Sequence, residues 1–284
     1  MNADVPSGWR AGKLRAGGVT LATYETGNRA SAAGTVLLLH GLGHWTDAAW
    51  GRLVPRLDPA LRYVAFDLPG FGASEKPAAA YDLLFFRRVT EDAVAAYGLD
   101  RVALVGHSLG GMIAADYASA HPSRVTHLAL IAPAGFSRTP RFLLFALAGA
   151  LAQRLFVPRP SRRFVARVLE RGVVDATVLD PAHVERAYEL TQEPALRRAY
   201  AGVYGGALRT IVNRRALHGG FARYTGPVFC AWGAQDRYIG IGALRNVQRV
   251  YPHLTTLVLE HSAHLPMIEE PDILGAALRA FLAS

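Results

Sequence analysis

The pentapeptide Gly106-His107-Ser108-Leu109-Gly110 constrains the fold of this chain more than any other part of the sequence. It follows directly on the apolar run Val102–Val105, and a helical pattern begins near Gly111. A tight turn from a buried strand into a helix has little room for side chains, so glycines stand two residues before and after the serine. We therefore predict a strand, a strained turn and a helix, with the Ser108 hydroxyl lifted clear of the backbone.

Short apolar runs alternate with helix-like stretches along most of the 284 residues, which are enough to bury a sizeable core. This alternation is typical of an α/β fold with a mostly parallel central sheet and helices on both faces. We expect the first run to pair antiparallel, and an amphipathic helix to begin at Pro271. The predicted strands are Val19–Tyr24, Thr35–Leu39, Arg62–Phe66, Val102–Val105, His127–Ile131, Val228–Trp232 and Thr256–Leu259.

Residues 137–221 break this rhythm. They contain no comparable strand runs, and apolar residues recur at helical spacing, as at Phe164 and Val168. The segment is much longer than a crossover between neighbouring strands requires. We predict a helical cap of residues 137–221 inserted into a core of residues 1–136 and 222–284. The alternative is that the segment supplies only the ordinary helices between two strands.

All of the excess positive charge falls in the same part of the chain. Residues 137–223 hold 15 arginines and 6 acidic residues, whereas the rest of the chain holds 16 basic and 16 acidic residues. No nucleic-acid motif accompanies the arginines, so nucleic acid is not expected as a partner. The arginines could attract an anionic substrate, an acyl carrier protein or an acidic membrane surface, and a solvated helix face is an equally good interpretation. The residues concerned are the apolar run Phe142–Ala152 and Arg159, Arg162, Arg163, Arg167 and Arg171.

Two further features bear on location. Met1–Pro6 contains no apolar segment of a secretory signal, and Phe142–Ala152 is too short to span a bilayer. The single cysteine, Cys230, excludes a disulfide framework. We expect a cytoplasmic protein with no transmembrane segment.

Glycine-rich turns also bind phosphates, but the spacing here does not fit. Gly106, Gly110 and Gly111 do not form G-x-G-x-x-G, and the turn Gly41-Leu42-Gly43 has Thr46 where a third glycine should stand. A serine at such a turn is better suited to be a nucleophile, which requires a base, an acid and an oxyanion hole.

The candidate acid is Asp236, and the candidate base is His264. Each follows a predicted strand, and the chain order Ser108, Asp236, His264 is that of one well-known catalytic triad. Asp236 could instead cap a turn, which is a common task for an aspartate after a glycine. His261 is a nearby competitor of His264.

Two backbone N–H groups are candidates for the oxyanion hole. One belongs to Leu109, directly after the serine, and the other to Leu42 in the glycine-containing loop after the strand Thr35–Leu39. We interpret the adjacent His40 as a buried structural residue that binds loop backbone, rather than as a second base.

These motifs together make the chain resemble the α/β-hydrolase fold family, over roughly residues 19–136 and 222–284. The resemblance implies that Ser108 is the nucleophile, and it sets aside the family members that act on epoxides or haloalkanes, which carry an aspartate at this position. Hydrolases of meta-cleavage products typically carry a tryptophan where Leu265 stands, which argues against that activity. Ala134-Gly135-Phe136 is similar to that group, so the activity is kept as an alternative. Apart from the turn around Ser108 and the loops of Asp236 and His264, the resemblance rests on His40-Gly41-Leu42-Gly43 and Asp67-Leu68-Pro69-Gly70-Phe71-Gly72-Ala73-Ser74.

The expected activity is hydrolysis of a small-molecule carboxylic ester, without a metal or cofactor. Ser108, Asp236 and His264 would form the triad, and Leu42 and Leu109 the oxyanion hole. A C–C bond hydrolase of the meta-cleavage type and an acyl thioesterase are the alternatives, and a ligand-binding protein without catalysis is a third. The sequence does not identify substrate-binding residues.

Overall fold

The structure is a computed structural model that describes residues 5, 7–29, 34–137, 159–212 and 214–284. Within them, one sheet has the strand order β1-β2-β4-β3-β5-β6-β7-β8. β2 is antiparallel to both of its neighbours, and the pairs from β4 to β8 are parallel. The strands are β1 (Arg10–Ala16), β2 (Val19–Gly27), β3 (Thr35–Leu39), β4 (Arg62–Phe66), β5 (Val102–His107), β6 (Val125–Ile131), β7 (Val228–Gly233) and β8 (Thr255–Leu259).

Successive side chains of the parallel strands enter two hydrophobic clusters, one on each face of the sheet. In β3, Leu37 and Leu39 belong to one cluster, and Val36 and Leu38 belong to the other. This alternation follows from the two-residue period of a strand. Because both faces are buried, the strands read in the sequence as unbroken apolar runs.

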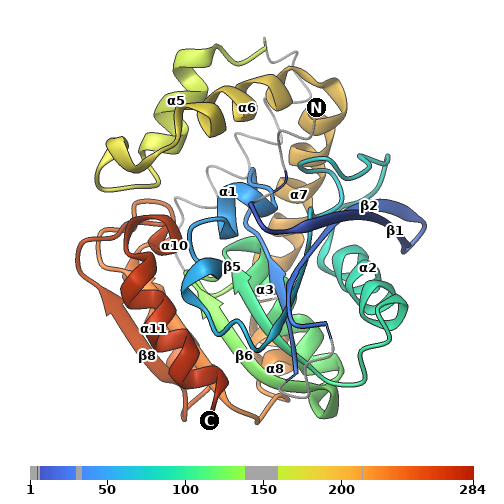
Figure 1. Cartoon of the computed structure of the whole chain (residues 1–284), viewed down its shortest axis with the longest axis vertical. Coiled ribbons are helices and arrows are strands. Elements are labelled where there is room, and N and C mark those ends of the chain that lie inside the picture. The colour runs from blue at the N-terminus through green and yellow to red at the C-terminus, as the bar shows by residue number, and fades with distance from the viewer. Residues whose placement is uncertain (1–4, 6, 30–33, 138–158, 213) are drawn as a thin grey trace.

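Helices cover both faces, which confirms the predicted α/β architecture. Phe86 of α2, Ile113 of α3 and Val247 of α9 pack in the first cluster, and Trp50 of α1 and Leu278 of α11 pack in the second. Figure 1 shows α11 and α2 on opposite sides of the molecule, with the sheet between them. The helices of this part are α1 (Thr46–Trp50), α2 (Leu83–Ala96), α3 (Leu109–Ala120), α9 (Leu244–Val250), α10 (Pro266–Glu269) and α11 (Pro271–Leu282).

Three details differ from the sequence-based expectation. β1 was not predicted, because it is an edge strand that is largely exposed and carries no apolar run. α3 begins at Leu109, slightly earlier than expected, because Ser108 already serves as its N-cap. The short helix α10 stands in the expected loop after His264, with Pro266 in its first turn.

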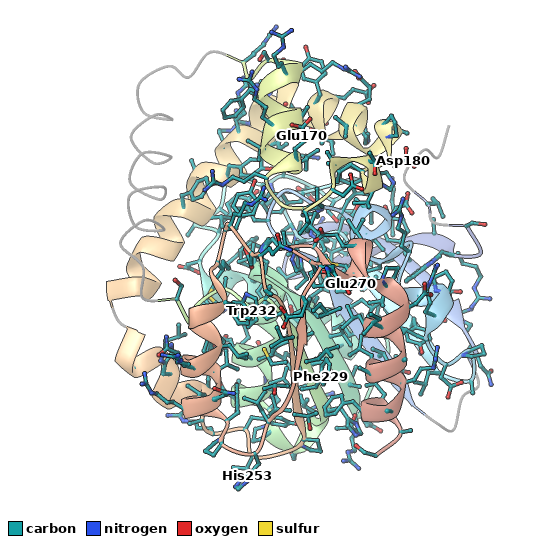
Figure 2. The ribbon with its side chains drawn as sticks, turned by 90° about the vertical axis from the view of Figure 1, so that its left-hand side faces the viewer. Glu170, Asp180, Phe229, Trp232, His253 and Glu270 are labelled. Carbon is teal, nitrogen blue, oxygen red and sulfur yellow. The ribbon has the colours of Figure 1, made fainter. Side chains whose placement is uncertain are left out.

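Between β6 and β7, the described residues form helices and turns without a strand. α5 and α6 lie together at the top of the molecule in Figure 1. In Figure 2, β7 runs upward from Phe229 to Trp232, toward Glu170 of α5 and Asp180 before α6, so these helices lie beyond the carboxyl ends of the strands. The helices are α5 (Arg162–Glu170), α6 (Pro181–Gln192), α7 (Pro194–Val212) and α8 (Arg214–Phe221).

The last of these helices belongs with the sheet rather than with α5 and α6. α8 packs on α3, and its Phe221 is fully buried in the first hydrophobic cluster. The division into a core and a separate cap domain therefore stays a prediction, and the apolar run Phe142–Ala152 lies outside the described residues. In the part of the chain that is described, no helix is both long and apolar enough to cross a membrane.

Candidate active site

Ser108 stands between β5 and α3 in a backbone conformation that side chains rarely adopt. Its φ is 51° and its ψ is −113°, which costs about 1–3 kcal/mol and persists only where the surroundings enforce it. The surroundings do so from the end of β6: Ser108 N–H donates to the Ile131 carbonyl at 2.9 Å, and the Ser108 carbonyl accepts from Ala134 N–H at 2.9 Å. The sharp turn expected from the sequence is present.

The glycines of the pentapeptide are required by close packing. A Cβ on Gly106 would collide with the backbone of Gly110, and a Cβ on Gly110 would collide with the Leu39 carbonyl. The turn is thus pressed against the end of β3, and Ser108 is the residue whose side chain it presents.

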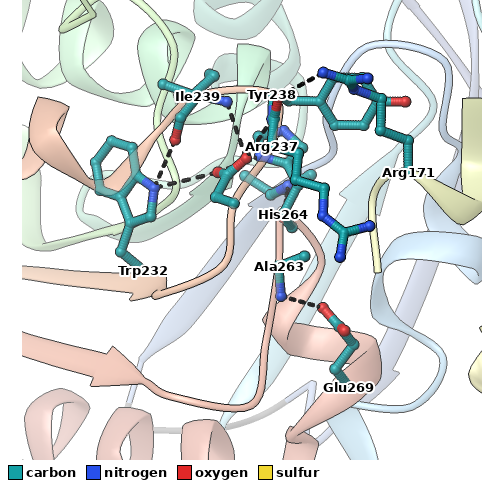
Figure 3. Close-up of polar contacts among 10 residues, drawn as sticks. Arg171, Trp232, Arg237, Tyr238, Ile239, Ala263, His264 and Glu269 are labelled. Carbon is teal, nitrogen blue, oxygen red and sulfur yellow. Dashed lines mark hydrogen bonds and ion pairs between the residues drawn. The ribbon is translucent and has the colours of Figure 1, made fainter. Parts of the chain in front are cut away.

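Asp236 and His264 meet in a buried pair. His264 Nδ1 donates to Asp236 Oδ2 at 2.7 Å, and the Asp236 side chain is fully shielded from solvent. The carboxylate is fixed by three more donors: Tyr238 N–H at 2.8 Å, Ile239 N–H at 2.9 Å and Trp232 Nε1 at 3.2 Å. Figure 3 shows these donors converging on the carboxylate. Because its acceptor positions are occupied, Asp236 holds the imidazole in one orientation and one tautomer.

Both alternatives considered for these residues are answered by the geometry. Asp236 does cap a turn, through the N–H groups of Tyr238 and Ile239, but its other oxygen binds His264. His261 is exposed, whereas His264 is 7% exposed. Asp236 therefore caps the turn and binds His264 at the same time.

His107, the neighbour of Ser108, connects the turn to the loop of His264. Its Nε2 donates to the His264 carbonyl at 2.9 Å, and the two rings lie 4.9 Å apart. Within the described residues no hydrogen bond joins Ser108 to His264. The structure thus pairs Asp236 with His264, and His107 links the turn of Ser108 to the loop of His264.

Burial lowers the pKa of each histidine that surrounds His264, which favours the neutral form. Burial lowers the pKa of His40, and it lowers the pKa of His107 well below the usual range. Burial, reinforced by nearby histidines, also lowers the pKa of His44 to about 3. As expected, His40 binds loop backbone: its Nδ1 donates to the Gly41 carbonyl at 2.8 Å, and its Nε2 accepts from Leu68 N–H at 2.8 Å.

The loop after β3 passes directly beside the serine. A Cβ on Gly41 would lie 2.6 Å from His107 Nδ1 and 3.1 Å from Ser108 Cβ, so the backbone approaches as closely as it can. The N–H groups of Leu42 and Leu109 donate to no atom among the described residues. Two unpaired donors therefore flank the serine on neighbouring segments.

A cavity of about 300 Å³ opens between α1, α6 and α10. Its lining includes His44, whose ring is 5.9 Å from that of His107, and Leu265, the neighbour of His264. Ser108 is not part of this lining. Most of the remaining lining is apolar, with a polar edge formed by Asp47, Arg52, Asp180 and His183.

Sequence reasoning missed three residues that hold this site: Trp232, His107 and Glu269. Glu269 Oε2 accepts from Ala263 N–H at 2.7 Å (Figure 3). In the part of the chain that is described, no group of three or more His, Cys, Asp or Glu side chains is placed to hold a metal ion.

Comparison with known proteins agrees with this fold. A profile of the alpha/beta hydrolase fold family matches residues 34–271. The chain belongs to this family, and the predicted fold class is confirmed.

An uncharacterized protein of Mycobacterium tuberculosis is 26% identical over 266 residues, which cover 89% of this chain and 76% of that protein. Among solved structures, a bacterial membrane phospholipase A is 27% identical, with a TM-score of 0.77 over 97% of this chain and 86% of the other. A 2-hydroxy-6-oxo-6-phenylhexa-2,4-dienoate hydrolase of Rhodococcus is 21% identical, with a TM-score of 0.81 over 97% and 99%. The likeness to the Rhodococcus hydrolase shows the fold alone. Together with membership in the family, these neighbours support a hydrolase.

Proposed function

We propose that this protein is a serine hydrolase that cleaves carboxylic esters through an acyl-enzyme intermediate. The observation that carries the proposal is the buried Asp236–His264 hydrogen bond of 2.7 Å, together with a serine held at a φ of 51° whose neighbour His107 donates to the His264 carbonyl. A strained serine next to an oriented imidazole is the arrangement that nucleophilic acyl transfer needs. A cytoplasmic location, as expected from the sequence, is part of the proposal.

In the proposed reaction, His264 Nε2 takes the hydroxyl proton as Ser108 Oγ attacks the ester carbonyl carbon. Asp236 stabilises the imidazolium that forms, and the N–H groups of Leu42 and Leu109 bind the negative oxygen. The intermediate collapses, and His264 gives the proton to the departing alcohol. A water molecule, deprotonated by His264, then attacks the acyl-enzyme; the bond to Ser108 Oγ breaks, Oγ takes back the proton from His264, and the acid is released.

The cavity beside His44 and Leu265 supports a substrate with an apolar group. Its volume of about 300 Å³ is at the lower end of the range for small-molecule sites. We propose that it receives one side of the ester, and that longer groups must extend past α6.

Two other reactions use the same residues. A C–C bond hydrolase of the meta-cleavage type would act on a carbon–carbon bond, and an acyl thioesterase would release a thiol. Leu265 is 2% exposed and lines the cavity with an aliphatic side chain. A leucine at this position supports an ester with an aliphatic group.

The test is hydrolysis of p-nitrophenyl esters from acetate to palmitate by the wild type and by Ser108→Ala. We expect turnover that is lost in the variant, with an optimum at a short or medium acyl chain. Turnover that survives in Ser108→Ala would reject the serine, and a wild type inactive on every ester would reject the ester in favour of thioesters, C–C substrates or a ligand-binding role.

A further inference from the structure

Glu269 is the last residue of α10, and its carboxylate binds two backbone N–H groups from distant parts of the chain. Oε2 accepts from Ala263 N–H at 2.7 Å, directly before His264, and Oε1 accepts from Val174 N–H at 2.5 Å, in the segment between α5 and α6. A second link lies on the other side of Ala263, because His264 N–H donates to the Gly172 carbonyl at 2.9 Å. The loop of His264 and the segment between α5 and α6 are thus joined at the consecutive residues Ala263 and His264.

This contact suits an ionised carboxylate. Each oxygen accepts a backbone N–H, and a protonated acid would have less acceptor capacity. Burial raises the pKa of Glu269, while the N–H groups of Val174, Ala263 and Leu265 oppose that shift. Charge-assisted hydrogen bonds of this kind are about twice as strong as neutral ones. Glu269 therefore supplies one of the two links between these segments.

The α5–α6 side also contacts the loop of the candidate acid. The Tyr238 hydroxyl donates to the Val168 carbonyl, and the Tyr238 ring lies 5.4 Å from the ring of His264. Arg171, at the end of α5, reaches the Arg237 carbonyl at 3.5 Å. Figure 3 shows Arg171 and Tyr238 on one side of His264 and Glu269 on the other. A shift of the α5–α6 segment would therefore be transmitted to the imidazole from both sides.

We propose that Glu269 is a positioning residue, which keeps His264 aligned with Ser108 and at the same time keeps the α5–α6 segment against the site. The inference rests on the proposed serine hydrolase function. A displacement of about 1 Å in such a site can cost about 10²-fold in rate. The effect is therefore expected on the chemical step more than on ground-state binding of the substrate.

The experiment compares Glu269→Gln with the wild type and with Asp272→Asn. Glutamine keeps the shape of the side chain and one acceptor, but it turns an NH₂ group toward a backbone N–H. Asp272 is the matched control, because it is a nearby carboxylate, 79% exposed, that pairs with Arg56 at 2.8 Å. The measurements are kcat and KM for the best p-nitrophenyl ester, and the pH profile of Ser108 labelling by a fluorophosphonate.

For Glu269→Gln we expect kcat and the labelling rate to fall about 10- to 100-fold, with KM changed little. Hydrogen exchange of the peptide that contains Val174 should become faster, and the midpoint of the pH profile for labelling should move. Glu269→Asp, which keeps both acceptor oxygens, should recover part of the rate. Asp272→Asn should match the wild type.

Three results would overturn the inference: Glu269→Gln labelled at the wild-type rate with an unchanged pH profile, a loss that appears only in KM, or Glu269→Asp no faster than Glu269→Gln. If Glu269→Gln does not fold, Glu269→Asp decides the question. An altered pH profile of labelling in Glu269→Asp would support the inference, and an unaltered profile would overturn it. Wild-type labelling that persists in Ser108→Ala would instead remove the proposed function, and the inference with it.

Discussion

The α/β part and the helices α5 and α6 hold their side chains in different ways. In the α/β part, the ends of β5 and β7 fix Ser108 and Asp236, and both residues are buried. In α5 only Val165 is buried, and Phe164 is 59% exposed. α6 buries Ala187 and Leu190 in the first hydrophobic cluster, whereas the links of this part to the loops of Asp236 and His264 include hydrogen bonds to backbone groups. We therefore expect changes in the α/β part to affect the chemical step, and changes in α5 and α6 to affect selectivity and the response to pH and salt.

The largest expected effect belongs to Asp236→Asn. An amide cannot accept from both His264 Nδ1 and the other donors without turning its NH₂ group toward one of them, so the imidazole loses its fixed tautomer. We expect kcat for ester hydrolysis to fall about 10⁴-fold, with KM changed much less.

The matched control is Asp175→Asn, between α5 and α6. Asp175 caps a turn there by accepting from Thr177 N–H at 2.9 Å, and asparagine is an equally good cap. This variant should keep the wild-type kcat. If Asp236→Asn retained more than about a tenth of the activity, the assignment of the acid would be wrong.

The same contrast explains what could be predicted from the sequence. Buried parallel strands appear in the sequence as apolar runs, and the residues at their ends follow in a known order. The sheet and the candidates Ser108, Asp236 and His264 could therefore be predicted. β1 could not be predicted, because an exposed edge strand leaves no hydrophobic pattern. His107 stands inside the informative pentapeptide, yet nothing there shows that its Nε2 reaches the backbone of His264.

Glu269 illustrates the limit more generally. Its two partners are main-chain N–H groups, which every residue except proline carries, so no residue type marks them. Such contacts become visible only when the loops are in place. The roles of Leu42 and Leu109 stay predictions, because a free N–H group shows where an oxyanion could bind but not that one does.

The next effect concerns the contact between α6 and α1. His183 Nε2 lies 3.0 Å from Asp47 Oδ2, and this hydrogen bond, opposed by burial, raises the pKa of His183 above its ordinary value. A group with a raised folded-state pKa stabilises fully below its unfolded pKa, about 6.5, and the stabilisation is lost as pH rises through the folded value. The attachment of α6 should therefore weaken above neutral pH.

The measurement is limited proteolysis and thermal unfolding of the wild type and His183→Gln at about pH 5.5 and about pH 8.5. We expect the wild type to become easier to cleave within α5–α6 at the higher pH, and the variant to change less between the two. His253→Gln, which alters a histidine at the opposite end of the molecule (Figure 2), is the control. Equal pH dependence in His183→Gln and the wild type would contradict this account.

The smallest effect concerns the arginines of α5. Arg162 pairs with Glu185 at 2.5 Å, whereas Arg163 and Arg167 are exposed and form no ion pair within the described residues. If they attract anionic substrates, added salt should raise KM for a carboxylate-bearing ester a few-fold and leave KM for a neutral ester unchanged. Arg163→Gln with Arg167→Gln should remove this difference, and Arg88→Gln on α2 should not. The same salt response for both esters would indicate that the arginines form only a solvated helix face.

The central claim is that Ser108 is the nucleophile, and the most direct test is the mass of the labelled protein. After treatment with a fluorophosphonate, the account predicts one adduct per chain on the peptide that contains Ser108, and none in Ser108→Ala. An adduct on another residue, or an unchanged adduct in Ser108→Ala, would contradict it.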